Sequence, residues 1–136
     1  MHKKNNDSYY TNRHSCFLLC YHLVLVTKYR KPILAGNTKD TVYNTIKTIM
    51  KEKELHLVDI NGEADHLHIL FEARPDTNIA ELVNVIKTKT SRFARRDNAE
   101  ALRKFYYKPL FWTDSYFVST VGNNTKDIVK EYIKNQ

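Results

Sequence analysis

The stretch that decides the fold is LHLVDINGEADHLHILF, at residues 55–71. Two β-prone runs, at residues 55–60 and 66–71, flank the polar segment 61–65, which contains Gly62. Apolar runs of this length on either side of a short glycine-containing segment are typical of a β-hairpin. The pattern therefore predicts two adjacent antiparallel strands in the middle of the chain.

Two further strands are expected outside this hairpin. Residues 16–27 form a long β-prone run without Gly or Pro, which is typical of a buried central strand. Residues 110–121 are rich in aromatic side chains and are expected to form either a fourth strand or an irregular aromatic segment. Cys16 and Cys20, the two cysteines of the chain, would lie ~13 Å apart on an extended strand, which is too far for a disulfide. We expect both to be reduced thiols in the core.

Helical periodicity occurs on both sides of the hairpin. Before it, one apolar stripe consists of Val42, Ile46, Ile49 and Met50. The cap of this helix is expected at Asn37, Thr38 or Asp40. After it, Pro75 ends the strand and Asn78 is expected to cap a second helix. The inward stripe of that helix consists of Ile79, Leu82, Val83, Ile86 and Phe93.

The order of these elements is β-α-β-β-α-β, and a final helix opens at Thr125 after the break at residues 122–124. This order predicts an α+β fold with a ferredoxin-like split βαβ antiparallel sheet. The added C-terminal helix would carry Tyr132. We expect a single domain over residues 13–136, preceded by a flexible polar tail at residues 1–12.

The charge balance favours an anionic partner. Lys and Arg number 22 against 15 Asp and Glu, which gives a formal net charge of +7. Such a charge favours nucleic acid first and an anionic membrane surface second. The apolar run at residues 16–26 contains His22 and is shorter than the ~20 residues of a membrane span. Since residues 1–12 also lack a hydrophobic signal core, we expect a soluble, cytoplasmic protein with no membrane partner.

The second hairpin strand carries two histidines separated by one residue. Strand alternation places His66 and His68 on one face, ~7 Å apart along the strand, with Leu67 on the other face. Two imidazoles in this arrangement could bind one divalent cation, although a defined site needs a third ligand. The same alternation predicts that Asp65 points away from the histidines and closes the turn. The alternative is a pair of polar residues on the solvated face of a strand.

The last helix carries a tyrosine and a glutamine four residues apart. Tyr132 and Gln136 would therefore lie on one helix face, one turn apart. The amide oxygen of a glutamine is a hard ligand suited to Mg²⁺ or Mn²⁺, and a phenol is a nucleophile that can form a covalent intermediate. A nearby cation would favour the phenolate. The alternative is that Tyr132 packs against the domain and Gln136 is an ordinary helix end.

In combination these motifs resemble the single-tyrosine HUH transposases of small bacterial insertion sequences, including TnpA-like proteins and REP-associated tyrosine transposases. HUH denotes a histidine, a hydrophobic residue and a second histidine. The matching segments are YHLVLVTKYRK at residues 21–31, DHLHILF at residues 65–71 and FWTDSYFVSTVG at residues 111–122. Asn61-Gly62 and the Tyr-x-x-x-Gln pair complete the pattern. The resemblance covers nearly the whole chain from about Cys20 onward.

The resemblance implies a chemistry for these residues. His66, His68 and Gln136 would hold Mg²⁺ or Mn²⁺, and Tyr132 would attack the scissile phosphate. This attack would give a 5′-phosphotyrosine and a free 3′-hydroxyl, which would later attack that linkage to join new strands. Because each step exchanges one phosphodiester for another, no nucleotide cofactor is needed. The resemblance also implies a homodimer, in which a mobile catalytic helix at residues 125–136 completes the histidine site of the other subunit.

The substrate implied by the resemblance is single-stranded DNA with imperfect hairpins at the element ends. The expected DNA contacts are Lys87, Lys89, Ser91, Arg92, Arg95 and Arg96, followed by Lys28, Arg30, Lys31 and Arg13. Two positions depart from the pattern. Thr88 stands where relatives often carry Gly, and the chain stops at Gln136, whose terminal carboxylate could replace the amide as a ligand. The alternatives are a domesticated relative acting on repeated palindromes and a non-catalytic ferredoxin-like nucleic-acid-binding module.

Overall fold

The computed structural model describes residues 18–122 and Lys134. Its strands are β1 (Leu19–Val26), β2 (His56–Glu63), β3 (His66–Ala73) and β4 (Phe117–Val121). Its helices are α1 (Gly36–Glu52), α2 (Ile79–Asp97) and α3 (Ala99–Arg103), with a short 3-10 turn, η1 (Lys28–Arg30), directly after β1. The predicted final helix, with Tyr132 and Gln136, lies outside the described residues, as do Cys16 and Arg13.

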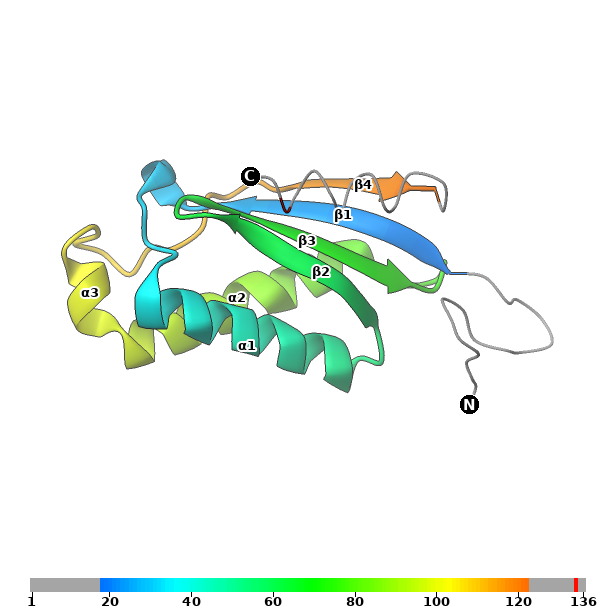
Figure 1. The fold of residues 1–136 in the computed structure, drawn as a ribbon. Helices are drawn as coiled ribbons and strands as arrows, with labels where there is room; N and C mark the ends of the chain where they lie inside the picture. The colour runs from blue at the N-terminus through cyan, green and yellow to red at the C-terminus, as the bar shows by residue number, and fades with distance from the viewer. Residues whose placement is uncertain (1–17, 123–133, 135–136) are drawn as a thin grey trace.

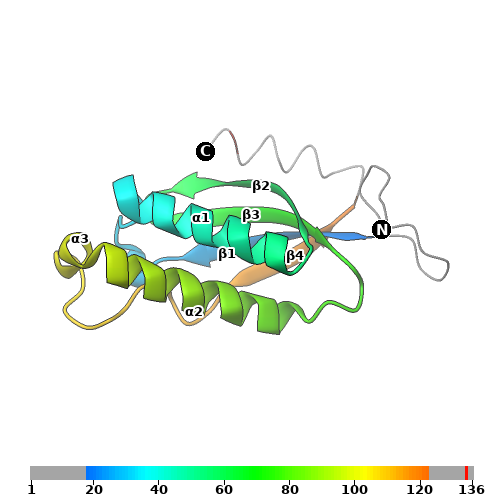
Figure 2. The same ribbon diagram turned by 90° about the horizontal axis from the view of Figure 1, so that it is seen from below.

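The sheet has the order β2-β3-β1-β4, and every pair of neighbouring strands is antiparallel. β3 lies between β1 and β2, the two strands that α1 connects, so the predicted split βαβ arrangement is confirmed. Helices α1 and α2 run side by side across one face of the sheet (Figures 1 and 2). β1 is a central strand, as its apolar sequence predicts.

The core lies between the sheet and these two helices. Leu67, Ile69 and Phe71 of β3 point into it and have no solvent exposure, because every second residue of a strand faces the same side. The predicted stripe of α1 is buried against them in full. The alternate residues of β3, which include both histidines, therefore belong to the sheet face opposite the helices.

The cap predicted for α2 is present, and the cap predicted for α1 is not. The Asn78 side chain accepts a hydrogen bond from the Glu81 backbone N–H at 3.0 Å, as predicted for the start of α2. The predicted side-chain cap of α1 is wrong, because α1 begins at Gly36 after Ala35 and has no side-chain cap. Its start is fixed instead by the buried Leu34, whose N–H donates to the carbonyl of Ala64 in the hairpin turn at 2.9 Å.

The hairpin turn is shorter than the sequence pattern predicts. β2 continues through Gly62 to Glu63, so only Ala64 and Asp65 connect it to β3. A Cβ atom at Gly62 would overlap the carbonyl oxygen of His66 and lie 2.9 Å from the Cα of Leu67. Glycine is therefore needed inside the strand, where β2 approaches β3 closely, and not in the turn.

The aromatic segment combines both predicted alternatives. Trp112 forms an isolated bridge with Thr27, and regular pairing with β1 begins only at Phe117. The Trp112 indole N–H donates to the Thr90 hydroxyl at 2.9 Å, which ties the segment to α2. Helix α3 is an element that the sequence pattern did not predict.

The predicted inward stripe of α2 is wrong at one position. Phe93 is only half-buried, and the guanidinium groups of Arg92 and Arg96 lie 5.5 and 4.8 Å from its ring centre. Thr90 and Ala94 take the buried positions instead. Among the residues from 18 to 122, none of the helices is long and apolar enough to span a membrane.

Candidate functional site

The two histidines of β3 lie together on the sheet face opposite the helices. Leu67 between them is fully buried in the core, so the predicted alternation is confirmed. The ring centres of His66 and His68 are 5.1 Å apart, and the ring planes are nearly perpendicular. His68 is 6% exposed, whereas His66 is half-buried. The pair is close enough to share one cation.

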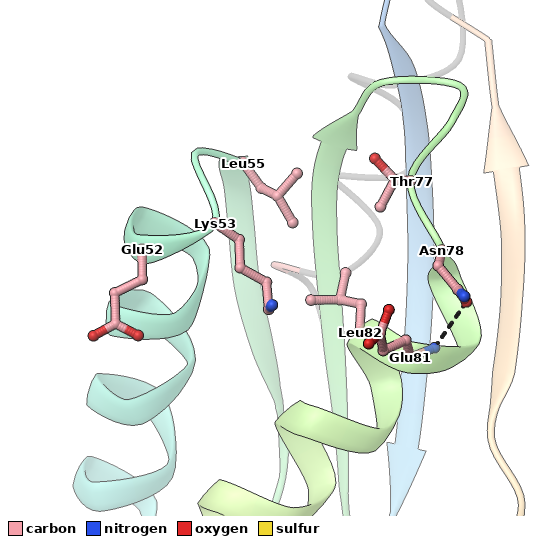
Figure 3. Close-up of a pocket in the computed structure, with 7 residues that line it drawn as sticks. All are labelled: Glu52, Lys53, Leu55, Thr77, Asn78, Glu81 and Leu82. Carbon is pink, nitrogen blue, oxygen red and sulfur yellow. Dashed lines mark hydrogen bonds between the residues drawn. The ribbon is translucent and has the colours of Figure 1, made fainter.

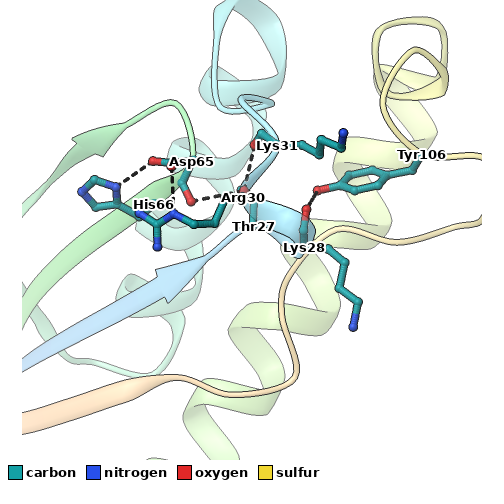
Figure 4. Close-up of polar contacts among 7 residues, drawn as sticks. All are labelled: Thr27, Lys28, Arg30, Lys31, Asp65, His66 and Tyr106. Atoms are coloured by element: carbon teal, nitrogen blue, oxygen red, sulfur yellow. Dashed lines mark hydrogen bonds and ion pairs between the residues drawn. The ribbon is translucent and has the colours of Figure 1, made fainter.

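Asp65 contacts His66 directly, which corrects the prediction that it points away. Its carboxylate accepts a hydrogen bond from Nδ1 of His66 at 2.9 Å and one from Nε of Arg30 at 3.2 Å (Figure 4). The prediction failed because β3 begins at His66, so strand alternation does not extend to Asp65. The hydrogen bond from His66 and the nearby Arg30 charge lower the pKa of Asp65, while burial acts in the opposite direction.

An ionised carboxylate only accepts hydrogen bonds, so the proton between these groups is on Nδ1 of His66. A neutral His66 therefore carries its lone pair on Nε2, and a metal would be bound through that atom. This contact between a carboxylate and a histidine is the usual support for a metal-binding imidazole.

The turn after β1 holds Asp65 in place. The Thr27 backbone N–H donates to the Asp65 carbonyl at 3.0 Å, and the Thr27 hydroxyl donates to the Lys31 carbonyl at 2.7 Å. The Tyr106 hydroxyl donates to the Lys28 carbonyl at 2.7 Å (Figure 4). Burial raises the pKa of Tyr106 to about 12, so this hydroxyl stays protonated at neutral pH.

Tyr29 and Arg30 in this turn have positive φ angles of 57° and 52°. Residues other than glycine rarely adopt this conformation, and it persists where surrounding contacts enforce it. The strained turn brings the Arg30 side chain back to Asp65, and thereby next to His66.

A third histidine, His22 of β1, contacts His68. Its Nε2 lies 2.9 Å from Nδ1 of His68, and the two rings are nearly coplanar, with their centres 5.1 Å apart and an interplanar angle of 18°. Burial, followed by the neighbouring His68, lowers the pKa of His22. Because Nδ1 of His68 is engaged in this hydrogen bond, a metal could be bound only through Nε2 of His68, and only when Nδ1 carries the shared proton.

The histidine pair fits a divalent metal in its donor chemistry. Both ligating nitrogens belong to rings whose Nδ1 atoms are held by hydrogen bonds, as in protein metal sites. Within the described part of the chain, no group of three His, Cys, Asp or Glu side chains is arranged to hold a metal ion. A third protein ligand would have to be another residue type or lie outside this part, and the predicted ligand Gln136 is a glutamine outside the described residues.

Most of the residues predicted to contact DNA fall into two groups. Lys28 and Arg30 lie in η1, at the end of β1. Arg30 pairs with Asp65, which contacts His66, and Lys28 pairs with Asp114 at 3.9 Å. The other group lies on α2, in the layer on the far side of the sheet. It consists of Lys87, Lys89, Ser91, Arg92, Arg95 and Arg96. Lys31, half-buried, follows η1, and Arg13 lies outside the described residues.

Lys87 connects the two groups. Its Nζ donates to the Thr113 carbonyl at 2.6 Å, next to the Asp114 partner of Lys28. Burial lowers the pKa of Lys87, and Lys28 lowers it further, against the opposing effect of Asp114. Positive groups thus continue from α2 around the end of the sheet to η1.

A groove of about 430 Å³ opens beside η1 and combines aromatic and basic side chains. Tyr29 is 69% exposed and Tyr107 is 90% exposed. The basic residues of the lining are Arg103, Lys104 and Lys108. Exposed aromatic rings among positive charges can stack unpaired bases and contact the phosphates between them.

A second pocket, of about 410 Å³, lies at the other end of the molecule between the end of α1 and the start of α2 (Figure 3). Leu55 and Thr77 in its lining are next to β2 and β3 at the ends remote from His66. It has no contact with the histidine pair.

Sequence reasoning missed His22 and set Asp65 aside, and it did not identify the Tyr29–Tyr107 groove. The one available signal for His22 was a histidine inside the otherwise apolar run of β1, since a polar residue in a buried strand needs a partner. The groove joins residues 29 and 107, which no local pattern connects.

Comparisons with known proteins agree with this geometry. Residues 15–136 match the family model described as "Transposase IS200 like". The chain is 31% identical over 117 residues to the transposase for insertion sequence element IS200 of Salmonella typhimurium, covering 85% of this chain and 75% of the relative. It is 28% identical over 120 residues to the ISDra2 transposase TnpA of Deinococcus radiodurans, covering 88% and 85% respectively.

Two solved structures share the fold. A candidate transposase from Deinococcus radiodurans R1 superposes with a TM-score of 0.74 and 28% identity, covering 93% of this chain and 96% of the other. A REP-associated tyrosine transposase bound to a REP hairpin superposes with a TM-score of 0.64 and 11% identity, covering 90% and 70%. A family match over nearly the whole chain, joined to the split βαβ sheet and its histidine pair, shows that this chain belongs to the IS200-like transposases.

Proposed function

We propose that this transposase cuts and rejoins single-stranded DNA at hairpin-bearing element ends through a 5′-phosphotyrosine on Tyr132. His66, His68 and Gln136 would hold Mg²⁺ or Mn²⁺. The observation that carries the proposal is the histidine pair on one face of β3, with the Nδ1 atom of each ring in a hydrogen bond. Tyr132 and Gln136 enter through the sequence pattern and the family match, since both lie outside the described residues.

The proposed reaction exchanges one phosphodiester for another. The Tyr132 oxygen attacks the scissile phosphorus, and the bond from phosphorus to the 3′ oxygen breaks. The phenol loses its proton and the 3′ oxygen gains one, which leaves a 3′-hydroxyl and a 5′-phosphotyrosine. Attack of a 3′-hydroxyl on the phosphotyrosine reverses these changes and joins new strands. No ATP and no hydrolytic water are consumed.

The described residues would prepare the site for this reaction. Asp65 fixes the orientation and tautomer of His66, and Arg30 holds Asp65 from the other side. A bound divalent cation supplies Lewis acidity, which polarises the phosphodiester and favours the phenolate. The chemistry requires the imidazoles to be neutral, and the hydrogen bond to Asp65 orients the proton of His66 accordingly.

The distribution of positive charge supports DNA as the partner. Arg30 contacts Asp65 beside His66, Lys28 lies in the same turn, and the groove with Tyr29 and Tyr107 offers stacking surfaces for unpaired nucleotides. The basic residues of α2 would contact the backbone of a hairpin. A relative of the same fold bound to a REP hairpin supports a DNA hairpin as the ligand.

We also propose a homodimer acting on DNA in the cytoplasm, since family resemblance implies that the tyrosine helix of one subunit can complete the site of the other. Mixing Tyr132→Phe with His68→Ala tests this arrangement. Activity restored in the mixture would support a shared site, and two inactive variants that stay inactive as a mixed dimer would contradict it.

Denaturing gels test the chemistry directly. The protein is incubated with labelled single-stranded hairpins taken from the DNA that flanks its gene, together with Mg²⁺ or Mn²⁺. We expect a covalent protein–DNA adduct that chelation of the metal abolishes. Tyr132→Phe should abolish it too, whereas the matched control Tyr43→Phe should retain it, since Tyr43 lies on α1, in the helical layer on the sheet face opposite the histidine pair. An undiminished adduct in Tyr132→Phe, or none with any flanking hairpin, would overturn the mechanism.

A further inference from the structure

His22 lies on the same sheet face as His68, on the neighbouring strand β1 and two residues from the position that pairs with His68. β1 and β3 pair Val24 with His68 and His22 with Leu70, so His22 and His68 are diagonal neighbours on adjacent strands. The 2.9 Å separation between Nε2 of His22 and Nδ1 of His68 is a hydrogen bond. His68, at 6% exposure, is held in this contact inside the protein.

One proton lies between these two nitrogens, and its position decides whether His68 can bind a metal. If Nε2 of His22 donates, a neutral His68 carries its own proton on Nε2 and has no lone pair there. If Nδ1 of His68 donates, Nε2 of His68 has the lone pair and His22 carries its proton on Nδ1. Only the second arrangement allows His68 to act as a ligand through Nε2.

We propose that His22 is a positioning residue, which accepts the Nδ1 proton of His68 and thereby holds His68 in the tautomer that binds the metal. This inference rests on the proposed metal site of His66 and His68. In this proposal His22 supports His68 through a hydrogen bond to Nδ1, as Asp65 supports His66. The two rings are nearly coplanar, with an interplanar angle of 18°, which is the geometry that an in-plane hydrogen bond between them requires.

Burial explains why the hydrogen-bond acceptor is an imidazole, His22, at His68 and a carboxylate, Asp65, at His66. Asp65 has 29% of its side chain exposed and an Arg30 partner, so its charge is both solvated and balanced. His68 is nearly buried, where an ionised acceptor would be costly to desolvate. A neutral imidazole supplies an acceptor at that position without a charge.

His22 is assigned a supporting role and not that of a third metal ligand. Its Nε2 atom is engaged by Nδ1 of His68, at the side of that ring remote from Nε2. No group of three His, Cys, Asp or Glu side chains within residues 18–122 has the arrangement of a metal site, which is consistent with this assignment.

Two substitutions of His22 test its hydrogen-bond acceptor and its aromatic ring separately. His22→Phe keeps an aromatic ring at this position and removes the acceptor. His22→Gln replaces the ring but keeps an acceptor oxygen that can reach the Nδ1 proton of His68. His56→Phe is the matched control, because His56 is exposed on β2 near the other end of the sheet.

Metal binding is measured on the full-length protein without DNA, by electron paramagnetic resonance of free Mn²⁺. We expect His22→Phe to weaken Mn²⁺ binding by about 10- to 100-fold, as loss of a supporting partner of a histidine ligand typically does. His22→Gln should retain most of the affinity, and His56→Phe all of it. Hairpin binding in the presence of a chelator should be the same in all four proteins, which a general loss of structure would not allow.

The tautomer is measured separately, from the imidazole ¹⁵N shifts of His68 in the metal-free protein. We expect a proton on Nδ1 of His68 in the wild type and a gain of the Nε2-protonated form in His22→Phe. This measurement decides the inference even if both variants fold poorly.

The outcomes distinguish this inference from the proposed function. Wild-type affinity for Mn²⁺ in His22→Phe, or a proton on Nε2 of His68 in the wild type, would overturn the role of His22 and leave the metal site intact. A wild-type protein that binds no Mn²⁺ would overturn the metal site itself, and the inference with it.

Discussion

Substitution of Asp65 by asparagine tests how the metal site is supported. The carboxylate accepts from both Nδ1 of His66 and Nε of Arg30, at 2.9 and 3.2 Å. An asparagine has one acceptor oxygen and turns an NH₂ group toward the other donor, so one of the two contacts is lost. Hydrogen bonds to charged groups contribute about 1.5–3 kcal/mol. Because Asp65 is 29% exposed and Arg30 is 62% exposed, we expect the lower end of that range.

A loss of about 1.4 kcal/mol corresponds to a tenfold change in an equilibrium constant. We therefore expect Asp65→Asn to require about tenfold more Mn²⁺ for half-maximal adduct formation, in agreement with the 10- to 100-fold effect of losing such a partner. At saturating Mn²⁺ the rate should recover. The control is Asp114→Asn, which removes the fully exposed partner of Lys28 and should leave the Mn²⁺ requirement unchanged.

The assay is a titration of adduct formation against Mn²⁺ for the three proteins. An Asp65→Asn protein with the wild-type Mn²⁺ requirement would refute the reasoning. So would a reduced maximal rate at an unchanged requirement, because it would place the effect of Asp65 on a step other than metal binding.

Two further substitutions test the scaffold by urea unfolding. Gly62→Ala should destabilise the protein by about 1–3 kcal/mol, because the new Cβ overlaps the His66 carbonyl and crowds Leu67; unchanged stability would mean that β2 and β3 can separate without cost. Tyr106→Phe should cost about 1 kcal/mol through the lost hydrogen bond to the Lys28 carbonyl, and equal unfolding free energies of variant and wild type would contradict that contact.

Local patterns in the sequence predicted most of the fold. The alternation of residues 66–71, the α1 stripe and the Asn78 cap each depend on neighbours within a few residues, and each is confirmed. The predictions that failed depend on tertiary packing. Phe93 has helical spacing for the core, yet Arg92 and Arg96 cover its ring and Ala94 is buried instead.

In the candidate site, too, the features set by local pattern could be predicted and those set by tertiary packing could not. The shared face of His66 and His68 follows from strand alternation and is visible in the sequence. The contact between His22 and His68 depends on the register of β1 against β3, two strands separated by 46 residues at that point. Asp65 depends on where a turn ends, because a strand start one residue earlier would have turned its side chain away from His66.

The sheet itself separates the two surfaces proposed to contact DNA. The histidine pair is on the face opposite the helices, and the basic residues of α2 are in the helical layer. One DNA hairpin that contacted both on a single subunit would have to pass around the sheet, and the end at η1 is the one with basic residues close to Asp65 and His66. At that end Arg30 and Lys28 are already paired with Asp65 and Asp114. A phosphate bound to Arg30 there would compete with Asp65, the residue that contacts His66, so the proposed DNA contact and the proposed metal site would be coupled through one guanidinium group.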